Sequence, residues 1–312
     1  MTTGLLAAFV VEALMFGGIA LTALDMRAHS RVENLGGVNV WGYRGPVLRT
    51  KRANEVRVAI AGGDLSFGRL VSPNETIASY MPRVVSLDAD APGRADREVV
   101  ATPAGAVGLP AQEYAAWLAH LSFLQADVVC LVIDPPDHTP LTNAYLPNRH
   151  SLIFKRFGYS PILPLVLQEK SALIRSRAVG AAGALVGAAN DGLSERRVAT
   201  GGVLDPSHYV DAIEAATREG LRIAPAGVVI VVPAPPGDAP VYAAIAEALS
   251  SRFESERRVR VVDLGRDRRL RSAELRLDGF SFSAAGNSAA ANLISPAAIE
   301  LIRAASMKRA SR

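Results

Sequence analysis

The sequence has almost no cysteine. Its 312 residues include one, Cys130, so no disulfide can form within the chain. Cys130 lies in the apolar run 128–133, where we expect it to be a small core residue. The chain also lacks a G-x-G-x-x-G turn and a glycine-lysine-serine/threonine loop, which argues against the usual dinucleotide and nucleoside triphosphate sites. We therefore expect no cofactor.

An excess of charge of one sign is also missing. The 34 basic and 30 acidic residues give a net charge of +4, and no nucleic-acid-binding motif accompanies it. Residues 255–271 are rich in arginine, but an isolated run of charge most often forms a solvated face. We expect no nucleic-acid partner. Apolar residues make up 49% of the chain and charged residues 21%, as in an ordinary globular fold.

One long hydrophobic run is present at the N-terminus. Residues 4–24 contain a single charge, Glu12, and are long enough to cross a membrane, which takes about 20 apolar residues. This run predicts an uncleaved membrane anchor over residues 1–25, with a buried core helix as the alternative. Arginines and a lysine follow the run and none precedes it, so the positive-inside rule favours a cytoplasmic domain.

Strand-like and helix-like segments alternate after a polar connector over residues 26–55. The alternation predicts a three-layer α/β/α sandwich with a mostly parallel five-stranded sheet, over residues 56–305. Residues 143–191 break the rhythm and are predicted to be an insertion or lid, with contact to a membrane surface as the alternative. Residues 306–312 form a basic tail. The expected strands are 56–61, 98–102, 128–133, 228–232 and 259–264, and the expected helices 74–81, 110–124, 207–219, 241–252 and 283–301.

The end of the first predicted strand is the most informative stretch. The apolar run 58–61 stops at Gly62-Gly63-Asp64, and a polar turn to Gly68 follows. Open parallel sheets bind ligands in crevices at the carboxyl ends of their strands. Asp64 is therefore the first candidate for a functional residue.

Several short blocks occur in an informative order along the chain. The blocks are 39–46 (NVWGYRGP), 62–68 (GGDLSFG), Gly108, 134–137 (DPPD), 278–281 (DGFS) and 285–287 (AGN). Together they resemble the SGNH (GDSL-type) hydrolases, in the membrane-anchored bacterial form, over most of residues 5–305.

The resemblance assigns family positions to residues of this chain. Asp64 takes the place of the serine nucleophile, and Gly108 that of the glycine that donates to the oxyanion. Pro136 stands where the family has asparagine. Asp278 matches the family's aspartate, and Ser281 replaces its histidine. By resemblance, these five positions are the catalytic site.

The substitutions remove the parts of a serine hydrolase that do the chemistry. Acyl transfer by serine needs a hydroxyl, a base that takes its proton and donors for the oxyanion. Asp64 is not a hydroxyl, Ser281 is not a base and Pro136 has no N–H. The interpretation that follows is a catalytically inactive relative that binds a glycan, lipid or protein partner in the former substrate crevice.

Two alternatives remain open at the level of the sequence. The chain could be an active esterase or deacetylase with Ser66 as nucleophile and His138 as base. It could instead hold a divalent metal on Asp64, Asp137 and Asp278, with Asp134 close by. Relatives of this form act on acyl groups of sugars or lipids at the cell envelope. The resemblance thus implies a single-pass protein of the cell membrane with an extracytoplasmic domain, against the charge rule.

Overall fold

The computed structural model describes most of the chain in two compact units. One unit comprises Met1–Gly42 and Ala144–Ser194, and the other comprises Tyr43–Asn143 and Glu195–Arg312. The described residues are 2–34, 38–68, 70–87, 98–134, 152–159, 161–163, 206–233, 240–277 and 280–310.

The larger unit is built on one parallel sheet. Its strand order is β2-β1-β3-β4-β5, and every neighbouring pair is parallel. Strands β1, β3 and β4 are buried from end to end, as their β-branched and apolar residues require. The strands are β1 (Glu55–Gly62), β2 (Glu98–Pro103), β3 (Val128–Val132), β4 (Gly227–Val232) and β5 (Val259–Asp263).

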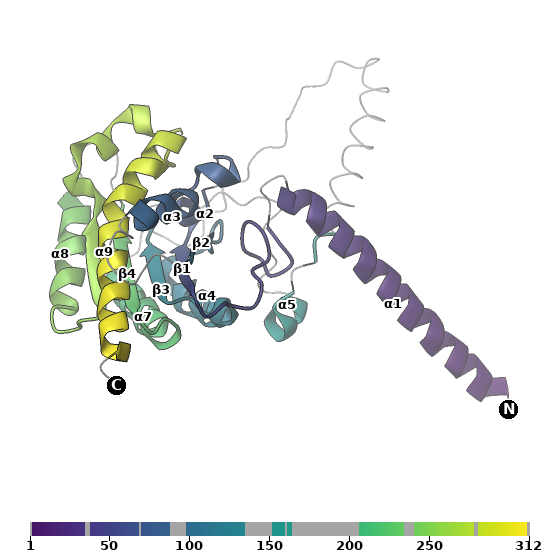
Figure 1. The fold of residues 1–312 in the computed structure, drawn as a ribbon. Helices are drawn as coiled ribbons and strands as arrows, with labels where there is room; N and C mark the ends of the chain where they lie inside the picture. The colour runs from purple at the N-terminus through teal and green to yellow at the C-terminus, as the bar shows by residue number, and fades with distance from the viewer. Residues whose placement is uncertain are drawn as a thin grey trace, which may run out of the picture. The chain divides into compact units, whose positions relative to one another are not determined.

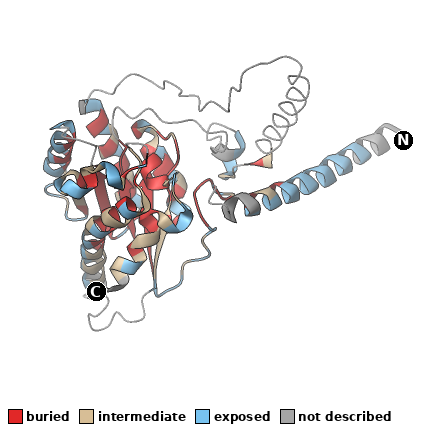
Figure 2. Ribbon diagram, turned by 90° about the horizontal axis from the view of Figure 1, so that it is seen from above, coloured by how far each residue is buried: buried red, intermediate tan, exposed pale blue. Residues whose placement is uncertain are grey.

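Helices cover both faces of this sheet. On one face α3 (Ile77–Leu87) packs against α9 (Ala284–Ala310), and both contribute to a core with alternate residues of β1, β3 and β4. The other face carries α4 (Tyr114–His120), α7 (Pro206–Ile223) and α8 (Pro240–Arg252). Figures 1 and 2 show the buried strands between these helices. The predicted three-layer sandwich with five parallel strands is confirmed.

The helices depart from the sequence-based expectation more than the strands do. The helix expected over 110–124 is divided into a 3-10 turn (Ala111–Glu113), α4, and a second 3-10 turn (Leu121–Leu124). The helix expected over 74–81 is divided into a 3-10 turn (Pro73–Glu75) and α3, which runs to Leu87, with the extended residue Thr76 between them. Helix α9 runs past its expected end through Ala310, into the basic tail, although Pro296 lies inside it.

The smaller unit contains α1 (Thr2–Asn34), which holds the predicted anchor and continues into the predicted connector. Within the part of the chain that the structure describes, this is the one helix long and apolar enough to cross a membrane, over Phe9–Ser30. Its large apolar side chains are exposed, including Phe9, Leu14 and Phe16. The segment 143–191 is described only at 152–159 and 161–163, where α5 (Leu152–Phe157) lies.

Candidate functional site

The turn after β1 can be made only by glycines. Gly62 has φ +134°, and a Cβ there would lie 1.9 Å from the carbonyl oxygen of Val132. A Cβ on Gly63 would lie 1.8 Å from Oδ2 of Asp134. The chain then enters α2 (Asp64–Phe67), a single turn of helix whose four residues are buried. The glycines thus let the end of β1 approach the end of β3 closely, with Asp64 at the start of the turn.

Asp64 and Gly108 meet at this strand end. The backbone N–H of Gly108 donates a hydrogen bond to Oδ1 of Asp64 over 2.8 Å. Asp64 is buried, and Gly108 adopts a left-handed conformation with φ +66°. The loop before Gly108 is held beside β1, because the amides of Ala104 and Ala106 donate to the carbonyls of Ile60 and Gly62. The Asp64 carboxylate therefore accepts a hydrogen bond from the amide N–H that, by resemblance, would donate to the oxyanion.

The Asp134 carboxylate accepts hydrogen bonds from two further backbone amides of the turn. Its Oδ2 accepts from the N–H of Asp64 at 2.7 Å, and its Oδ1 accepts from the N–H of Leu65 at 3.2 Å. Asp134 is itself buried at the end of β3. Its carboxylate satisfies two donors at the start of α2 that have no partner within the helix. Two carboxylates thus take up three backbone amides at one end of the sheet.

Two tyrosines fix Asp134 from the helices on one face of the sheet. The N–H of Asp134 donates to the hydroxyl oxygen of Tyr114 on α4 at 3.1 Å. The hydroxyl of Tyr209 on α7 donates to the carbonyl oxygen of Asp134. Burial raises the pKa of Tyr114 well above its ordinary value, and the negative charge of Asp134 adds to this shift. Tyr114 therefore stays a neutral phenol and is unsuited to act as a general base at neutral pH.

Arg44 holds the far end of α2. Its Nη1 donates to the carbonyl oxygens of Phe67, at 3.0 Å, and of Gly68, and its Nη2 donates to that of Val71 at 2.6 Å. The guanidinium also lies over the Phe67 ring, 5.3 Å from its centroid. Burial lowers the pKa of Arg44 to about 10, which leaves it charged at neutral pH. One buried cation thus donates hydrogen bonds to three backbone carbonyls where the turn ends.

Ser66 points into the domain. Its side chain is 1% exposed, and its hydroxyl donates to the carbonyl oxygen of Gly63 at 2.7 Å. A Cβ on Gly105 would lie 2.0 Å from Ser66 Oγ, so the hydroxyl is packed against the backbone of the neighbouring loop. The base paired with Ser66 in the esterase hypothesis, His138, lies outside the described residues. The Ser66 hydroxyl is engaged within its own turn.

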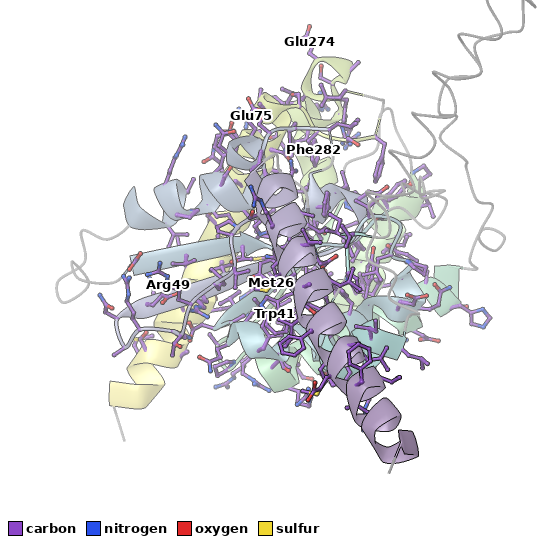
Figure 3. The ribbon with its side chains drawn as sticks, turned by 90° about the vertical axis from the view of Figure 1, so that its right-hand side faces the viewer. Met26, Trp41, Arg49, Glu75, Glu274 and Phe282 are labelled. Carbon is purple, nitrogen blue, oxygen red and sulfur yellow. The ribbon has the colours of Figure 1, made fainter. Side chains whose placement is uncertain are left out.

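Ser281 lies before α9, next to an isolated backbone bridge. Arg276 and Phe282 form an antiparallel bridge, and the N–H of Leu277 donates to the carbonyl oxygen of Ser281 at 2.9 Å. The Arg276 guanidinium lies over the Phe282 ring, 4.1 Å from its centroid, and Figure 3 labels this phenylalanine. Ser281 is half-buried. The other candidate residues of these loops, Pro136, Asp137 and Asp278, lie outside the described residues.

The metal hypothesis stays a prediction. Of its three ligands, only Asp64 belongs to the described part of the chain. Within that part, no group of three or more histidine, cysteine, aspartate or glutamate side chains is arranged to hold a metal ion.

Several of these contacts have no signal in the sequence. Tyr114 and Tyr209 lie 20 and 75 positions from Asp134, and their hydroxyl bonds depend on how α4 and α7 pack. Asp134 could be placed at a strand end from the apolar run before it, but not as the cap of α2. Arg44 belongs to a block that the resemblance includes, and its role follows only from the folded structure.

No protein-family model matches the sequence, and no curated protein matches it either. Solved structures are similar to this chain at low sequence identity. An α/β hydrolase enzyme from the metagenome of Lake Arreo is 16% identical with a TM-score of 0.46, covering 79% of this chain and 96% of its own. A G-D-S-L family lipolytic protein from Desulfitobacterium hafniense is 13% identical with a TM-score of 0.40, covering 79% and 99%. A family 3 carbohydrate esterase from Clostridium thermocellum is 13% identical with a TM-score of 0.42, covering 80% and 98%. These structures are similar to this chain only at low identity, so its resemblance to the SGNH (GDSL-type) hydrolases rests on the order of its sequence blocks.

Proposed function

We propose that the larger unit is an SGNH-type domain without serine esterase activity, which binds an envelope glycan, lipid or protein partner in the former substrate crevice. The observation that supports this most directly is the hydrogen bond from the Gly108 amide to the Asp64 carboxylate, at 2.8 Å. The side chain at the nucleophile's position occupies the donor that acyl transfer would need.

The chemical consequence is twofold. Asp64 has no hydroxyl group, so it cannot form the acyl-ester intermediate of a serine hydrolase. It also places negative charge beside the amide where the negative charge of a tetrahedral intermediate would develop. Loss of one oxyanion donor alone costs about 3–4 kcal/mol of transition-state stabilisation. The loss of nucleophile and donor together removes the main sources of rate enhancement.

A binding role is consistent with the hydrogen bonds that hold both ends of α2. Asp134 and Arg44 fix the two ends of α2, and both are buried charged residues. Buried charge is costly to maintain unless it is hydrogen-bonded, as it is here. We infer that the strand-end loops, held in this way, present a surface to a ligand.

The cellular setting is part of the proposal. Helix α1 would anchor the protein in the cell membrane by a single pass, and the resemblance favours an extracytoplasmic position for the larger unit. The arginines that follow the apolar run argue for the opposite side. Cysteine-accessibility labelling of intact cells at an exposed position of the larger unit, such as Ser251→Cys on α8, decides between the two sides, because Cys130 is buried.

Hydrolysis of p-nitrophenyl acetate by the full chain in detergent tests the enzymatic part. We expect the natural protein to show no turnover above the background reaction. The triple variant Asp64→Ser, Pro136→Asn, Ser281→His should gain activity, because it restores nucleophile, donor and base together. Its matched control replaces Asp64→Ser by Asp64→Ala and should stay inactive. Turnover by the natural protein that Ser66→Ala or His138→Ala abolishes would instead establish the esterase alternative.

A further inference from the structure

The short helix α5 exposes an unusual amount of apolar surface. Leu152, Ile153 and Phe157 are 84%, 47% and 69% exposed. At 100° per residue these three side chains and the exposed Arg156 fall on one face of the helix. Exposed apolar side chains grouped on one face mark an interaction surface. An arginine within such a face is typical of helices at a lipid interface, where its stem lies along apolar surface and its head reaches the headgroups.

The chain directly after α5 is fixed to α1 by Asp25. The Asp25 carboxylate is 4% exposed and accepts hydrogen bonds from the amides of Ile162, at 2.9 Å, and Leu163, at 2.5 Å. It also accepts one from the hydroxyl of Tyr159. Burial and the neighbouring Asp25 raise the pKa of Tyr159 above its ordinary value, so its hydroxyl remains a donor. The His29 ring contacts the Tyr159 ring edge-on, at 6.0 Å between centroids.

Asp25 lies directly after the apolar part of α1. It follows Leu24, the last residue of the apolar run, and is the first charged residue after Glu12. If the apolar run 4–24 is the part of α1 that lies in the hydrocarbon, Asp25 lies where the hydrocarbon ends and the headgroups begin. Met26 and Arg27, the next residues, are exposed at the same level, and Figure 3 labels Met26.

The connection between this level and α5 is short. Gly158, with φ +67°, is the only residue between Phe157 and Tyr159. Two residues of chain span at most about 7 Å, so Phe157 cannot leave the neighbourhood of Tyr159. The exposed face of α5 is thereby kept near the membrane-facing end of the same unit.

We propose that α5 is a second membrane contact, which lies in the bilayer interface beside α1 and is placed there by Asp25. The occupant of its apolar face is the phospholipid bilayer that α1 crosses. Leu152, Ile153 and Phe157 enter the acyl-chain boundary, while Arg156 and Arg27 lie among the headgroup phosphates. This arrangement fixes how the anchor meets the rest of its unit, and it is independent of whether the larger unit is an enzyme.

Quenching by lipid tests the proposal. The full chain carries one environment-sensitive fluorophore on an introduced cysteine and is reconstituted in phosphatidylcholine vesicles that include lipids brominated in their acyl chains. Three positions are compared: Thr22→Cys in the apolar run, Leu152→Cys on α5, and Ser251→Cys, exposed on α8. The natural Cys130 is buried and should not react. We expect several-fold stronger quenching at positions 22 and 152 than at position 251.

The three positions separate failure of the proposal from failure of the anchor. Quenching at 22 with a signal at 152 equal to that at 251 would overturn the proposal and leave the membrane span intact. Absence of quenching at 22 would overturn both. In the background Asp25→Ala, quenching at 152 should fall toward that at 251 while position 22 is unchanged. The control Ser30→Ala, an exposed residue of the same helix, should change neither, and persistent quenching at 152 without Asp25 would refute its positioning role.

Discussion

The Asp64 carboxylate and the Gly108 amide are joined by a hydrogen bond of 2.8 Å. Asp64→Ala leaves this amide without its acceptor. A hydrogen bond to a charged group contributes about 1.5–3 kcal/mol, and because Gly108 is half-buried we expect a loss near the lower end. The free energy of unfolding in urea measures it. Asp64→Asn keeps an oxygen acceptor in place and should lose less.

The same variant should create an anion site. With the side chain removed, acetate can supply a carboxylate to the vacated Gly108 amide. A ligand that binds the folded but not the unfolded state raises stability by mass action. Acetate should therefore raise the melting temperature of Asp64→Ala and not that of the natural protein. Chloride at the same ionic strength is the control for a salt effect. An equal response of both proteins to acetate would contradict the assigned contact.

The close approach of Gly63 and Asp134 predicts strong coupling between them. Gly63→Ala places a Cβ 1.8 Å from Oδ2 of Asp134 and should displace its carboxylate. Asp134→Ala loses two charge-assisted hydrogen bonds to α2, worth about 2–4 kcal/mol together. The double variant should be less destabilised than the sum of the single variants by more than about 1 kcal/mol, because the clash has gone. Additive losses in urea unfolding would show that the two residues do not meet.

Arg44 should resist even a conservative replacement. Arg44→Lys keeps the charge but loses the planar fork that donates to three carbonyl oxygens. We expect a loss of about 1–3 kcal/mol in unfolding free energy. Hydrogen exchange should accelerate at the Gly68 amide, which closes α2 onto Asp64. Arg49→Lys, at an exposed position, is the matched control, and an equal effect there would rule out a specific role for Arg44.

Glu55, at the start of β1, should make the stability of the fold depend on pH in the acid range. Burial alone would raise the pKa of Glu55, but hydrogen bonds from Arg57 and from the Arg52 amide, with the charge of Arg57, lower it below its ordinary 4.5. A carboxyl with a lowered folded-state pKa stabilises the fold above its unfolded value and loses that contribution as the pH falls through the folded value. Unfolding free energy measured from pH 7 to pH 3 should therefore decline less steeply in Glu55→Gln.

Glu98→Gln is the control for this pH dependence. Glu98 pairs with Arg52 on the surface, where both side chains are more than half exposed, so its contribution is small. The slope of its stability against pH should match that of the natural protein. Identical slopes for Glu55→Gln and the natural protein would contradict the assigned role of Glu55.

The strands could be predicted closely because burial dictates their composition. The β-branched run of β4 and the apolar run of β3 were each placed to within one residue of their bounds. Helix ends were harder. The apolar run predicts where a membrane span stops, but α1 continues to Asn34 through a polar stretch in which Met26, Arg27 and Ala28 favour a helix. A proline inside a helix normally kinks or breaks it, yet α9 continues past Pro296, where buried neighbours such as Ala298 and Leu301 pack the helix against the core.

The candidate site could likewise be predicted only in part from the sequence. Asp64 could be placed at a strand end from the sequence, and the resemblance put Gly108 in the same crevice. The bonds that join Asp134 to Tyr114, to Tyr209 and to the start of α2 link residues far apart in the chain. Such contacts depend on packing of whole elements and have no local sequence pattern. The Asp134 carboxylate accepts two of these backbone amides, and a cation on Asp64, Asp137 and Asp278 stays a prediction.

Covalent trapping of an active serine tests the central claim most directly. The full chain is incubated with a fluorophosphonate, which reacts with activated serines, and its intact mass is measured. We predict no adduct on the natural protein, and an adduct on the triple variant Asp64→Ser, Pro136→Asn, Ser281→His at the introduced serine. A stoichiometric adduct on the natural protein, mapped to Ser66 or any other serine, would contradict the account and show that the domain is an enzyme.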